Sequence, residues 1–315
     1  MSFWINKRVL ITGGAGFLGS HIVDNLVGTR GVSPSQLVIP RYGVVDLRNW
    51  SACREVMKNV DVVIHLAAKV GGIAFNQTYP GTLFYDNILM GAQLLEAARL
   101  EKIDKFVQMG TVCSYPKYTH VPFVEADLWS GYPEETNAPY GVAKKALLVM
   151  SQAYRKQYGM NIIFLVPVNL YGPKDNFDLK SSHVIPALIR KFVDAVQNGR
   201  KEVFVWGTGN ASREFLYVED AAEAILAATE KYDKAAPVNL GTGNEITIKQ
   251  LAELIANLTG FKGKLIWETA MPDGQPRRCL DISLAKKEFA FEAKTDLTNG
   301  LQKTIEWFKD EFNKT

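Results

Sequence analysis

The chain has 315 residues, 47% of them hydrophobic and 22% charged, so it can form one large α/β unit or two lobes. Its formal net charge of +3 is small for this length and its basic residues are scattered, which excludes nucleic acid as the main partner. No segment approaches the roughly 18 apolar residues of a membrane span, and the N-terminus has no signal-peptide pattern. We therefore expect a cytoplasmic protein without membrane contact.

The cysteines and histidines form no metal-binding or disulfide pattern. Cys53, Cys113 and Cys279 are widely spaced, as is typical of reduced thiols in a cytosolic protein. The four histidines include no His-x-x-x-His pair, so we expect no metal site.

A glycine-rich turn follows the first apolar run, residues 8–12, and leads into an amphipathic segment over residues 20–27. In this turn Gly13 permits a tight bend, Gly16 lets the backbone approach a pyrophosphate, and Gly19 lets the helix pack on the strand. The phosphates would lie at the helix N-terminus, where free N–H groups favour anions. The pattern predicts a dinucleotide site, and its alternative is an ordinary packed strand-to-helix turn.

The residues after the second predicted strand, Leu37–Ile39, report on the cofactor. A site for NAD usually has Asp or Glu here, whereas this chain has Pro40, Arg41 and Tyr42. A guanidinium suits a 2′-phosphate, so Arg41 favours NADP(H) over NAD(H), unless it belongs to a solvated loop. Asp46 could cap the following helix or accept a hydrogen bond from the adenine amine, and both roles stay open.

Residues 60–68 form a continuous apolar run, as expected of a strand buried on both faces. His65 is then an interior histidine rather than a catalyst. Alternating strands and helices continue to residues 106–109, which predicts a Rossmann-type doubly wound parallel α/β sheet. Ligands bind at the carboxyl ends of such strands, where we expect residues 70–73, Asn76 and residues 110–113.

Tyr140 and Lys144 lie four positions apart in a predicted helix and so share one face. An ammonium beside a phenol favours the phenolate and is expected to lower the phenol pKa. Such a pair serves the proton transfers of carbonyl and alcohol chemistry. The spacing alone is common on surface helices, and the thiol of Cys113 alone would suit a small buried hydrophobe.

The second half begins after a further strand, residues 161–167, and becomes irregular and rich in Asn, Asp, Gly and Pro. Its dispersed arginines suit a diphosphate group, although each could also lie on a solvated loop. Trp206 could stack on a base or fill the edge of the core. We expect residues 1–167 to form the cofactor domain, with returns from the C-terminal half, and residues 168–315 to form mainly a smaller α/β substrate lobe.

Six segments give the chain a resemblance over nearly its whole length to the extended short-chain dehydrogenase/reductase family and, within it, to the GDP-L-fucose synthase branch. They are AAKVGGI (67–73), VCSYPK (112–117), ETNAPYGVAK (135–144), VPVNLYGPKDNF (166–177), SHVIPALIRKF (182–192) and WGTGNASREFLYVED (206–220). The resemblance implies NADPH-dependent 3,5-epimerisation and 4-reduction of a GDP-4-keto-6-deoxy-hexose. It also implies a homodimer formed through the helix of Tyr140.

The resemblance assigns site residues position by position. Catalytic roles fall on Thr111, Cys113, Tyr140, Lys144 and His183, with Cys113 and His183 as base and acid of the epimerisation. Cofactor contacts fall on Gly13, Gly14, Ala15, Gly16, Phe17, Leu18, Gly19, Arg41, Asp46, Leu47, Ala67, Ala68, Lys69, Met109, Gly110, Tyr140, Lys144, Pro167, Asn169, Leu170 and His183. Substrate contacts fall on Val70, Gly71, Gly72, Asn76, Asn169, Val184, Lys191, Trp206, Arg213, Arg278 and Asp281.

Two departures from the family pattern stand out. Val112 replaces a serine beside the triad hydroxyl, and Lys191 replaces an arginine, which removes a bidentate contact. The alternatives are therefore a 4-reductase or epimerase of another nucleotide-activated sugar, and a non-catalytic NADP-sensing protein of the same fold. A 4,6-dehydratase is disfavoured, because those enzymes carry Asp-Glu after the triad threonine.

Overall fold

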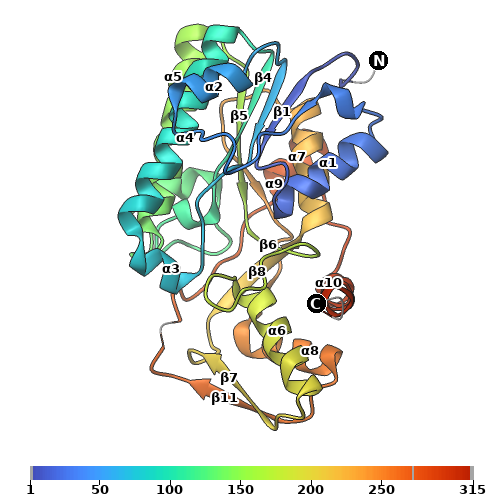
Figure 1. The fold of residues 1–315 in the computed structure, drawn as a ribbon. Coiled ribbons are helices and arrows are strands. Elements are labelled where there is room, and N and C mark those ends of the chain that lie inside the picture. The colour runs from blue at the N-terminus through green and yellow to red at the C-terminus, as the bar shows by residue number, and fades with distance from the viewer. Residues whose placement is uncertain (1–2, 272, 313–315) are drawn as a thin grey trace.

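Six parallel strands form the central sheet in the described part of the chain, residues 3–271 and 273–312 of this computed structural model (Figure 1). In spatial order the strands are β2 (Leu37–Val38), β1 (Val9–Thr12), β3 (Val62–His65), β4 (Lys105–Met109), β5 (Ile162–Pro167) and β9 (Val238–Leu240). Strand order reverses between the neighbouring strands β1 and β3, and such a switch point is where doubly wound sheets bind ligands. The predicted fold class is confirmed.

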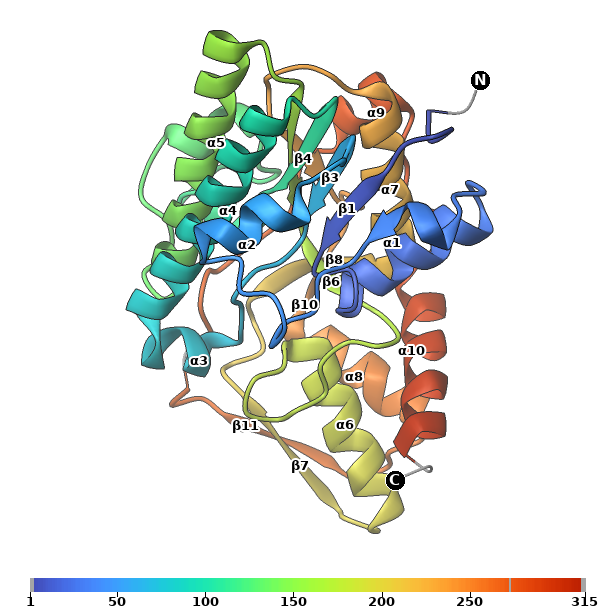
Figure 2. The ribbon, with the colours of Figure 1, turned by 45° about the horizontal axis from the view of Figure 1, so that its top comes forward.

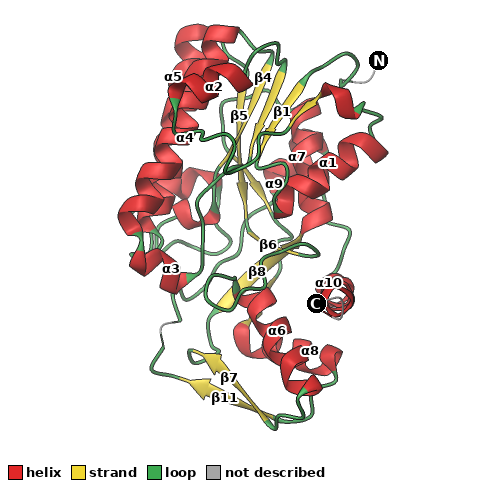
Figure 3. Cartoon of the chain, in the orientation of Figure 1, coloured by secondary structure: helices red, strands yellow, loops and turns green. Residues whose placement is uncertain are grey.

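Helices cover both faces of this sheet (Figure 3). One face carries α1 (Phe17–Gly28), α7 (Val218–Lys231) and α9 (Ser283–Phe289); the other carries α2 (Trp50–Val56), α4 (Pro80–Glu101) and α5 (Ala138–Tyr158). The strands are buried on both sides, so they read as continuous apolar runs in the sequence. The sheet thus has two separate hydrophobic cores, one under each helix layer.

A second lobe lies beyond the carboxyl ends of the strands (Figure 2). Only Val168 separates β5 from β6 (Asn169–Tyr171), which pairs with β8 (Ser212–Tyr217), and β8 pairs with β10 (Glu245–Thr247). The lobe also holds α6 (Val184–Gln197), α8 (Ile248–Thr259), α10 (Leu297–Phe312) and the parallel pair β7 (Glu202–Trp206) and β11 (Lys264–Glu268). A third hydrophobic cluster fills this lobe.

The remaining elements are short. They are α3 (Ile73–Thr78) and the 3₁₀ turns η1 (Pro34–Gln36), η2 (Val112–Ser114) and η3 (Glu125–Trp129). None of the described helices has the length and apolar character needed to cross a bilayer.

Several expected element boundaries were displaced. The first helix begins at Phe17, because the glycine turn leads into it directly, and the strand expected over 60–68 narrows to β3. Asn49, not Asp46, caps α2: its side chain accepts from the backbone N–H of Ser51 at 3.0 Å. Capping of α2 by Asp46 was therefore wrong.

Candidate active site

Thr111 lies two residues beyond the end of β4, after Gly110, and Tyr140 and Lys144 lie on one face of α5, as predicted. The Thr111 hydroxyl caps η2 by accepting from the backbone N–H of Cys113 at 3.2 Å. Gly141 lets α5 press against this turn, because a Cβ there would lie 2.3 Å from the carbonyl oxygen of Cys113. Close packing of α5 on η2 thus brings the phenol to the hydroxyl and the thiol.

The pKa of the Tyr140 phenol is raised rather than lowered. Burial disfavours the phenolate and the neighbouring Cys113 adds to this, while a hydrogen bond with Thr111 opposes both. Lys144 lies with Nζ 5.9 Å from the centre of the Tyr140 ring, and burial lowers its own pKa to about 8. The expected depression of the phenol pKa by Lys144 was wrong, because burial raises this pKa and only the hydrogen bond with Thr111 opposes it. The structure instead keeps Tyr140 protonated at neutral pH.

The turn between β1 and α1 has the form of a phosphate cradle. A Cβ at Gly13 would lie 3.0 Å from the backbone nitrogen of Ala67, and one at Gly19 would lie 2.1 Å from the carbonyl oxygen of Gly13. Gly14 is buried, whereas Ala15 and Gly16 are exposed at the start of α1. The backbone N–H groups of this helix end can therefore receive a pyrophosphate.

A second observation fits a dinucleotide. Lys144 is only 1% exposed, yet its ammonium makes no hydrogen bond or ion pair with any described residue. A buried cation without a partner is costly, and ribose hydroxyls would satisfy it. The residues present therefore fit a nicotinamide cofactor.

On the adenine side of the predicted site, one expected residue is exposed in a loop and another is hydrogen-bonded to a neighbouring arginine. Arg41 is exposed, in a loop where Tyr42 is 91% exposed. Both carboxylate oxygens of Asp46 receive hydrogen bonds from Arg48, which hold the pKa of Asp46 down at about 2. Leu47 is buried behind them.

The other expected cofactor residues surround the carboxyl ends of β1, β3, β4 and β5. Ala67 donates its N–H to the Thr12 hydroxyl at 3.2 Å, and the backbone of Lys69 is held by Asn87. His65 is fully buried with Nδ1 2.7 Å from the Thr12 hydroxyl, in agreement with an interior role. The expected residues at these strand ends include Phe17 and Leu18 after β1, Ala68 after β3, Met109 and Gly110 at the end of β4, and Pro167, Asn169 and Leu170 around the junction of β5 and β6.

Arg278 contacts the thiol of Cys113. Its Nη1 lies 3.7 Å from Sγ of Cys113 and 3.4 Å from Oδ1 of Asn169, while its Nε donates to Gln275 at 3.2 Å. Arg278 is 6% exposed, so a buried positive charge stands beside the sulfur. The structure thus places a cation where a thiolate would form.

His183 occupies the N-cap of α6, with Val184 beginning the helix. Its side chain is accessible, yet surrounding atoms and the charge of Arg278 hold the pKa of the imidazole below its usual value. Arg278 therefore acts on both members of the expected acid/base pair.

Two basic residues continue from Arg278 into the second lobe. Burial and the charge of Arg278 lower the pKa of Arg213 to about 9. Arg213 donates through Nη2 to the carbonyl oxygen of Asp273 at 2.9 Å, and Lys191 donates to the carbonyl oxygen of Phe204 at 2.8 Å. Trp206 is 45% exposed and stands outside the core cluster, so its indole is available to a ligand.

Asp281 does not join this group. Its Oδ1 accepts from the backbone N–H of Ser283 at 2.9 Å at the start of α9, and its own N–H pairs with Phe123. This hydrogen bond holds Asp281 in the turn before α9, whose N-cap residue is Ile282, whereas Asp273 is the aspartate that contacts Arg213. Asp273 accepts from the backbone N–H and the hydroxyl of Thr208 at 2.8 and 2.7 Å.

The segment after β3 reaches the start of α6. The N–H of Gly72 points to the carbonyl oxygen of Ser181 at 3.4 Å, and Val70 is 48% exposed next to Gly71. Asn76 is 5% exposed and donates to Oδ1 of Asn137 at 3.1 Å, just before α5. This segment therefore spans the distance from Tyr140's helix to His183.

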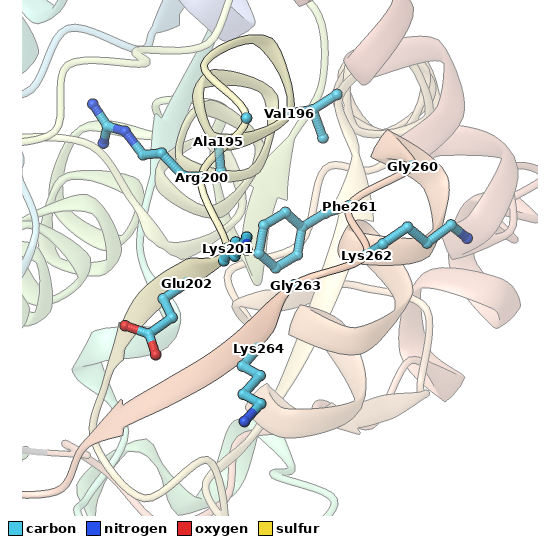
Figure 4. Close-up of a pocket in the computed structure, with 11 residues that line it drawn as sticks. Ala195, Val196, Arg200, Lys201, Glu202, Gly260, Phe261, Lys262, Gly263 and Lys264 are labelled. Carbon is cyan, nitrogen blue, oxygen red and sulfur yellow. The ribbon is translucent and has the colours of Figure 1, made fainter.

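A cavity of about 620 Å³ lies elsewhere (Figure 4). It lies where the chain leaves α6 and α8 and enters β7 and β11, around Phe261 and Lys264. Trp206 stands at the other end of β7, and the cavity contains none of the residues described above.

Comparison with known proteins agrees with this geometry. Residues 9–241 match the model of the NAD dependent epimerase/dehydratase family. The chain belongs to this family.

This epimerase/dehydratase is 40% identical to "Probable GDP-L-fucose synthase 1" of Oryza sativa subsp. japonica, over 98% of this chain and 94% of the relative. A GDP-6-OMe-4-keto-L-xylo-heptose reductase from C. jejuni has a TM-score of 0.92 and 28% identity, and the match covers 99% of this chain and 100% of that one. A GDP-L-fucose synthetase from Naegleria fowleri, solved with NADP bound, has a TM-score of 0.90 and 27% identity, covering 99% and 96%. The resemblance read from the sequence is confirmed.

Proposed function

We propose that the protein epimerises a GDP-4-keto-6-deoxy-hexose at C3 and C5 and reduces it at C4 with NADPH, giving a GDP-L-fucose-type sugar nucleotide. The observation that carries this proposal is the thiol of Cys113, 3.7 Å from Arg278 and next to Thr111 and Tyr140. A plain reductase needs only the hydroxyl, phenol and ammonium, whereas inversion beside a carbonyl also needs a base and an acid. The names of the similar proteins support the same substrate class.

Epimerisation depends on the acidity of the protons at C3 and C5, both next to the C4 carbonyl. Cys113, as the thiolate, takes a proton from one face of the sugar, and His183, as the imidazolium, returns one to the other face. The enolate oxygen accepts hydrogen bonds from Thr111 and Tyr140 in between, which stabilises its developing charge. The Cys113 thiol and the His183 imidazole then exchange protons with water before the second inversion.

Reduction follows at the same carbonyl. NADPH supplies the hydride for C4 when it is bound. Tyr140 gives its phenolic proton to the C4 oxygen, and its raised pKa keeps that proton available at neutral pH. Thr111 holds the oxygen by its hydroxyl, and Lys144 favours the phenolate that remains. One set of donors thus serves both reactions.

The choice of NADP(H) over NAD(H) rests on Arg41. Its guanidinium is exposed in the loop that follows β2, where it can pair with a 2′-phosphate. The NADP-bound relative supports this preference. Replacing Arg41 by alanine should weaken NADPH binding and leave NADH binding unchanged.

We also propose that the protein is a cytoplasmic homodimer. Helices α4 and α5 expose Tyr85 and Val149 at 59% and 50% on the outside of the molecule, next to Phe84 and Tyr158. An apolar face of this kind is suited to a second copy. Light scattering would detect the dimer, and Val149→Asp should shift it to monomer.

The deciding experiment is incubation with NADPH and GDP-4-keto-6-deoxy-mannose in deuterated water, followed by NMR of the product. Deuterium should appear at C3 and C5, and the product should be GDP-L-fucose. Cys113→Ser should abolish this incorporation and leave NADPH binding intact. Unchanged deuterium incorporation in Cys113→Ser would contradict the assignment of Cys113 as the base.

A 4-reductase without epimerisation is the second candidate, because the heptose reductase is similar over the whole chain. In that case NADPH is oxidised, but no deuterium enters at C3 or C5.

A further inference from the structure

A continuous line of contacts leads from Cys113 into the second lobe. Arg278 touches Cys113, and its charge acts on Arg213, which donates to the carbonyl of Asp273. Asp273 in turn holds Thr208, two residues after Trp206. If the sugar lies at Cys113 and the diphosphate at the arginines, the base lies at Trp206. This placement rests on the function proposed above.

The end of the β7–β11 pair offers a platform there. Val203 and Val205 of β7 are buried, whereas Phe204 and Trp206 are 49% and 45% exposed, so alternate residues face outward. The two strands are parallel, and Glu268 of β11 is paired with Trp206. Paired residues of neighbouring strands point to the same face about 5 Å apart. A carboxylate therefore stands beside an exposed indole.

Backbone hydrogen bonds hold the main chain of Glu268 in place, whereas its side chain makes no hydrogen bond with the described residues. Its carbonyl oxygen accepts from the N–H groups of Gly207 and Met271 at 3.1 and 3.0 Å. Its carboxylate is half-buried and has no hydrogen bond or ion pair with the described residues. Lys191 lies close enough for the charge of Glu268 to oppose the lowering of its pKa by burial.

The absence of a side chain at Gly207, directly after β7, leaves room for the carboxylate of Asp273. Gly207 has φ of +83°, and a Cβ there would lie 2.2 Å from Oδ1 of Asp273. The turn that carries Trp206 and the segment that carries Asp273 are therefore locked together. Strand pairing with Trp206 holds Glu268 at a fixed position beside these two segments.

We propose that Glu268 recognises the guanine base, accepting hydrogen bonds from N1–H and the 2-amino group while the ring stacks on Trp206. A carboxylate has two adjacent acceptor oxygens, and guanine presents two adjacent donors on this edge. Hypoxanthine offers only N1–H, and adenine offers an acceptor and a C–H at the same positions. A half-buried carboxylate left unpaired by those bases penalises them.

The test is isothermal titration of the full-length protein with GDP, IDP and ADP, for wild type and for Glu268→Gln. Wild type should bind GDP roughly tenfold to a hundredfold more tightly than IDP, and ADP more weakly still. Glu268→Gln should reduce the GDP-to-IDP ratio to within roughly threefold. Glu202→Gln, on the same outward face at the other end of β7, should keep the wild-type ratio.

Two outcomes would overturn the proposal in distinguishable ways. Tighter binding of ADP than of GDP by wild type would contradict the proposed substrate class as well. Preference for GDP that survives in Glu268→Gln would contradict the role of Glu268 alone. Glu268→Asp keeps the carboxylate and should retain the order of the three nucleotides, which separates base recognition from a folding defect.

Discussion

Nη1 of Arg278 lies 3.7 Å from Sγ of Cys113 and 3.4 Å from Oδ1 of Asn169. The thiol proposed as base and the arginine come from opposite lobes, 165 residues apart in the chain. A buried cation at this distance attracts negative charge that develops on the sulfur during the reaction, and it makes a positive charge on His183 less favourable. Arg278 therefore couples the two groups that epimerisation requires.

Replacing Arg278 should slow the reaction of Cys113 with iodoacetamide. Arg278→Met removes the charge and should reduce the alkylation rate at pH 7 roughly tenfold, whereas Arg278→Lys should retain most of it. Mass spectrometry would assign the modified thiol, since Cys53 and Cys279 are buried. Equal rates in wild type and Arg278→Met would contradict the activation of Cys113 by Arg278.

Replacing Tyr140 should separate the two reactions. Tyr140→Phe removes the proton donated to C4 and should lower NADPH oxidation by roughly 10²-fold or more. Thr111, Cys113 and His183 remain, so part of the deuterium exchange at C3 and C5 should persist. Parallel measurement of absorbance and NMR would show this, and a variant that keeps most of its NADPH oxidation would refute the assignment.

Replacing Gly141 should destabilise the fold. Gly141→Ala places a methyl group 2.3 Å from the Cys113 carbonyl, a backbone atom that cannot turn away. We expect a loss of about 2 kcal/mol or more in the free energy of unfolding, measured with urea. Gly81→Ala, in α4, is the matched control, because a Cβ there meets no described atom within 4 Å. A loss no larger than in this control would show that α5 can shift.

Asp175 should make the protein less stable as the pH rises. Burial raises its pKa from 3.8 to about 7, and its Oδ2 has no hydrogen-bond partner among the described residues. Between these values the folded protein keeps a proton that the unfolded chain has released, so stability falls through this interval. The total effect is at most about 4 kcal/mol.

The variant that tests this is Asp175→Asn. It should flatten the dependence of unfolding free energy on pH between about 4 and 7 and should be the more stable protein near pH 8. Asp310→Asn, at an exposed position of α10, should follow the wild-type curve. If the unfolding free energy of Asp175→Asn falls with pH as steeply as that of wild type, the carboxyl of Asp175 is hydrated and does not cause the pH dependence.

Much of this site could be read from local patterns. Helical spacing placed Tyr140 with Lys144, and apolar runs ending in glycine or a hydroxyl located the carboxyl ends of β1 and β4. These features depend on residues within one turn or one strand, so the sequence determines them directly.

Features that depend on distant residues could not be read in this way. The raised pKa of Tyr140 results from burial by several elements. Capping of α2 was one of two roles left open for Asp46, but Arg48, two residues along, donates to its carboxylate and Asn49 caps the helix. Asp281 was predicted from the sequence, but Asp273 is the aspartate whose backbone accepts from Arg213, a contact between residues 60 positions apart.

The close packing of Gly141 against Cys113 has a consequence for how related activities diverge. The backbone at position 113 is held by the helix that carries Tyr140, so the reductase machinery fixes it regardless of the side chain there. A lineage can then gain or lose epimerisation by exchanging a single side chain, without rebuilding the backbone. Synthases and simple reductases within one family would need no larger difference than this.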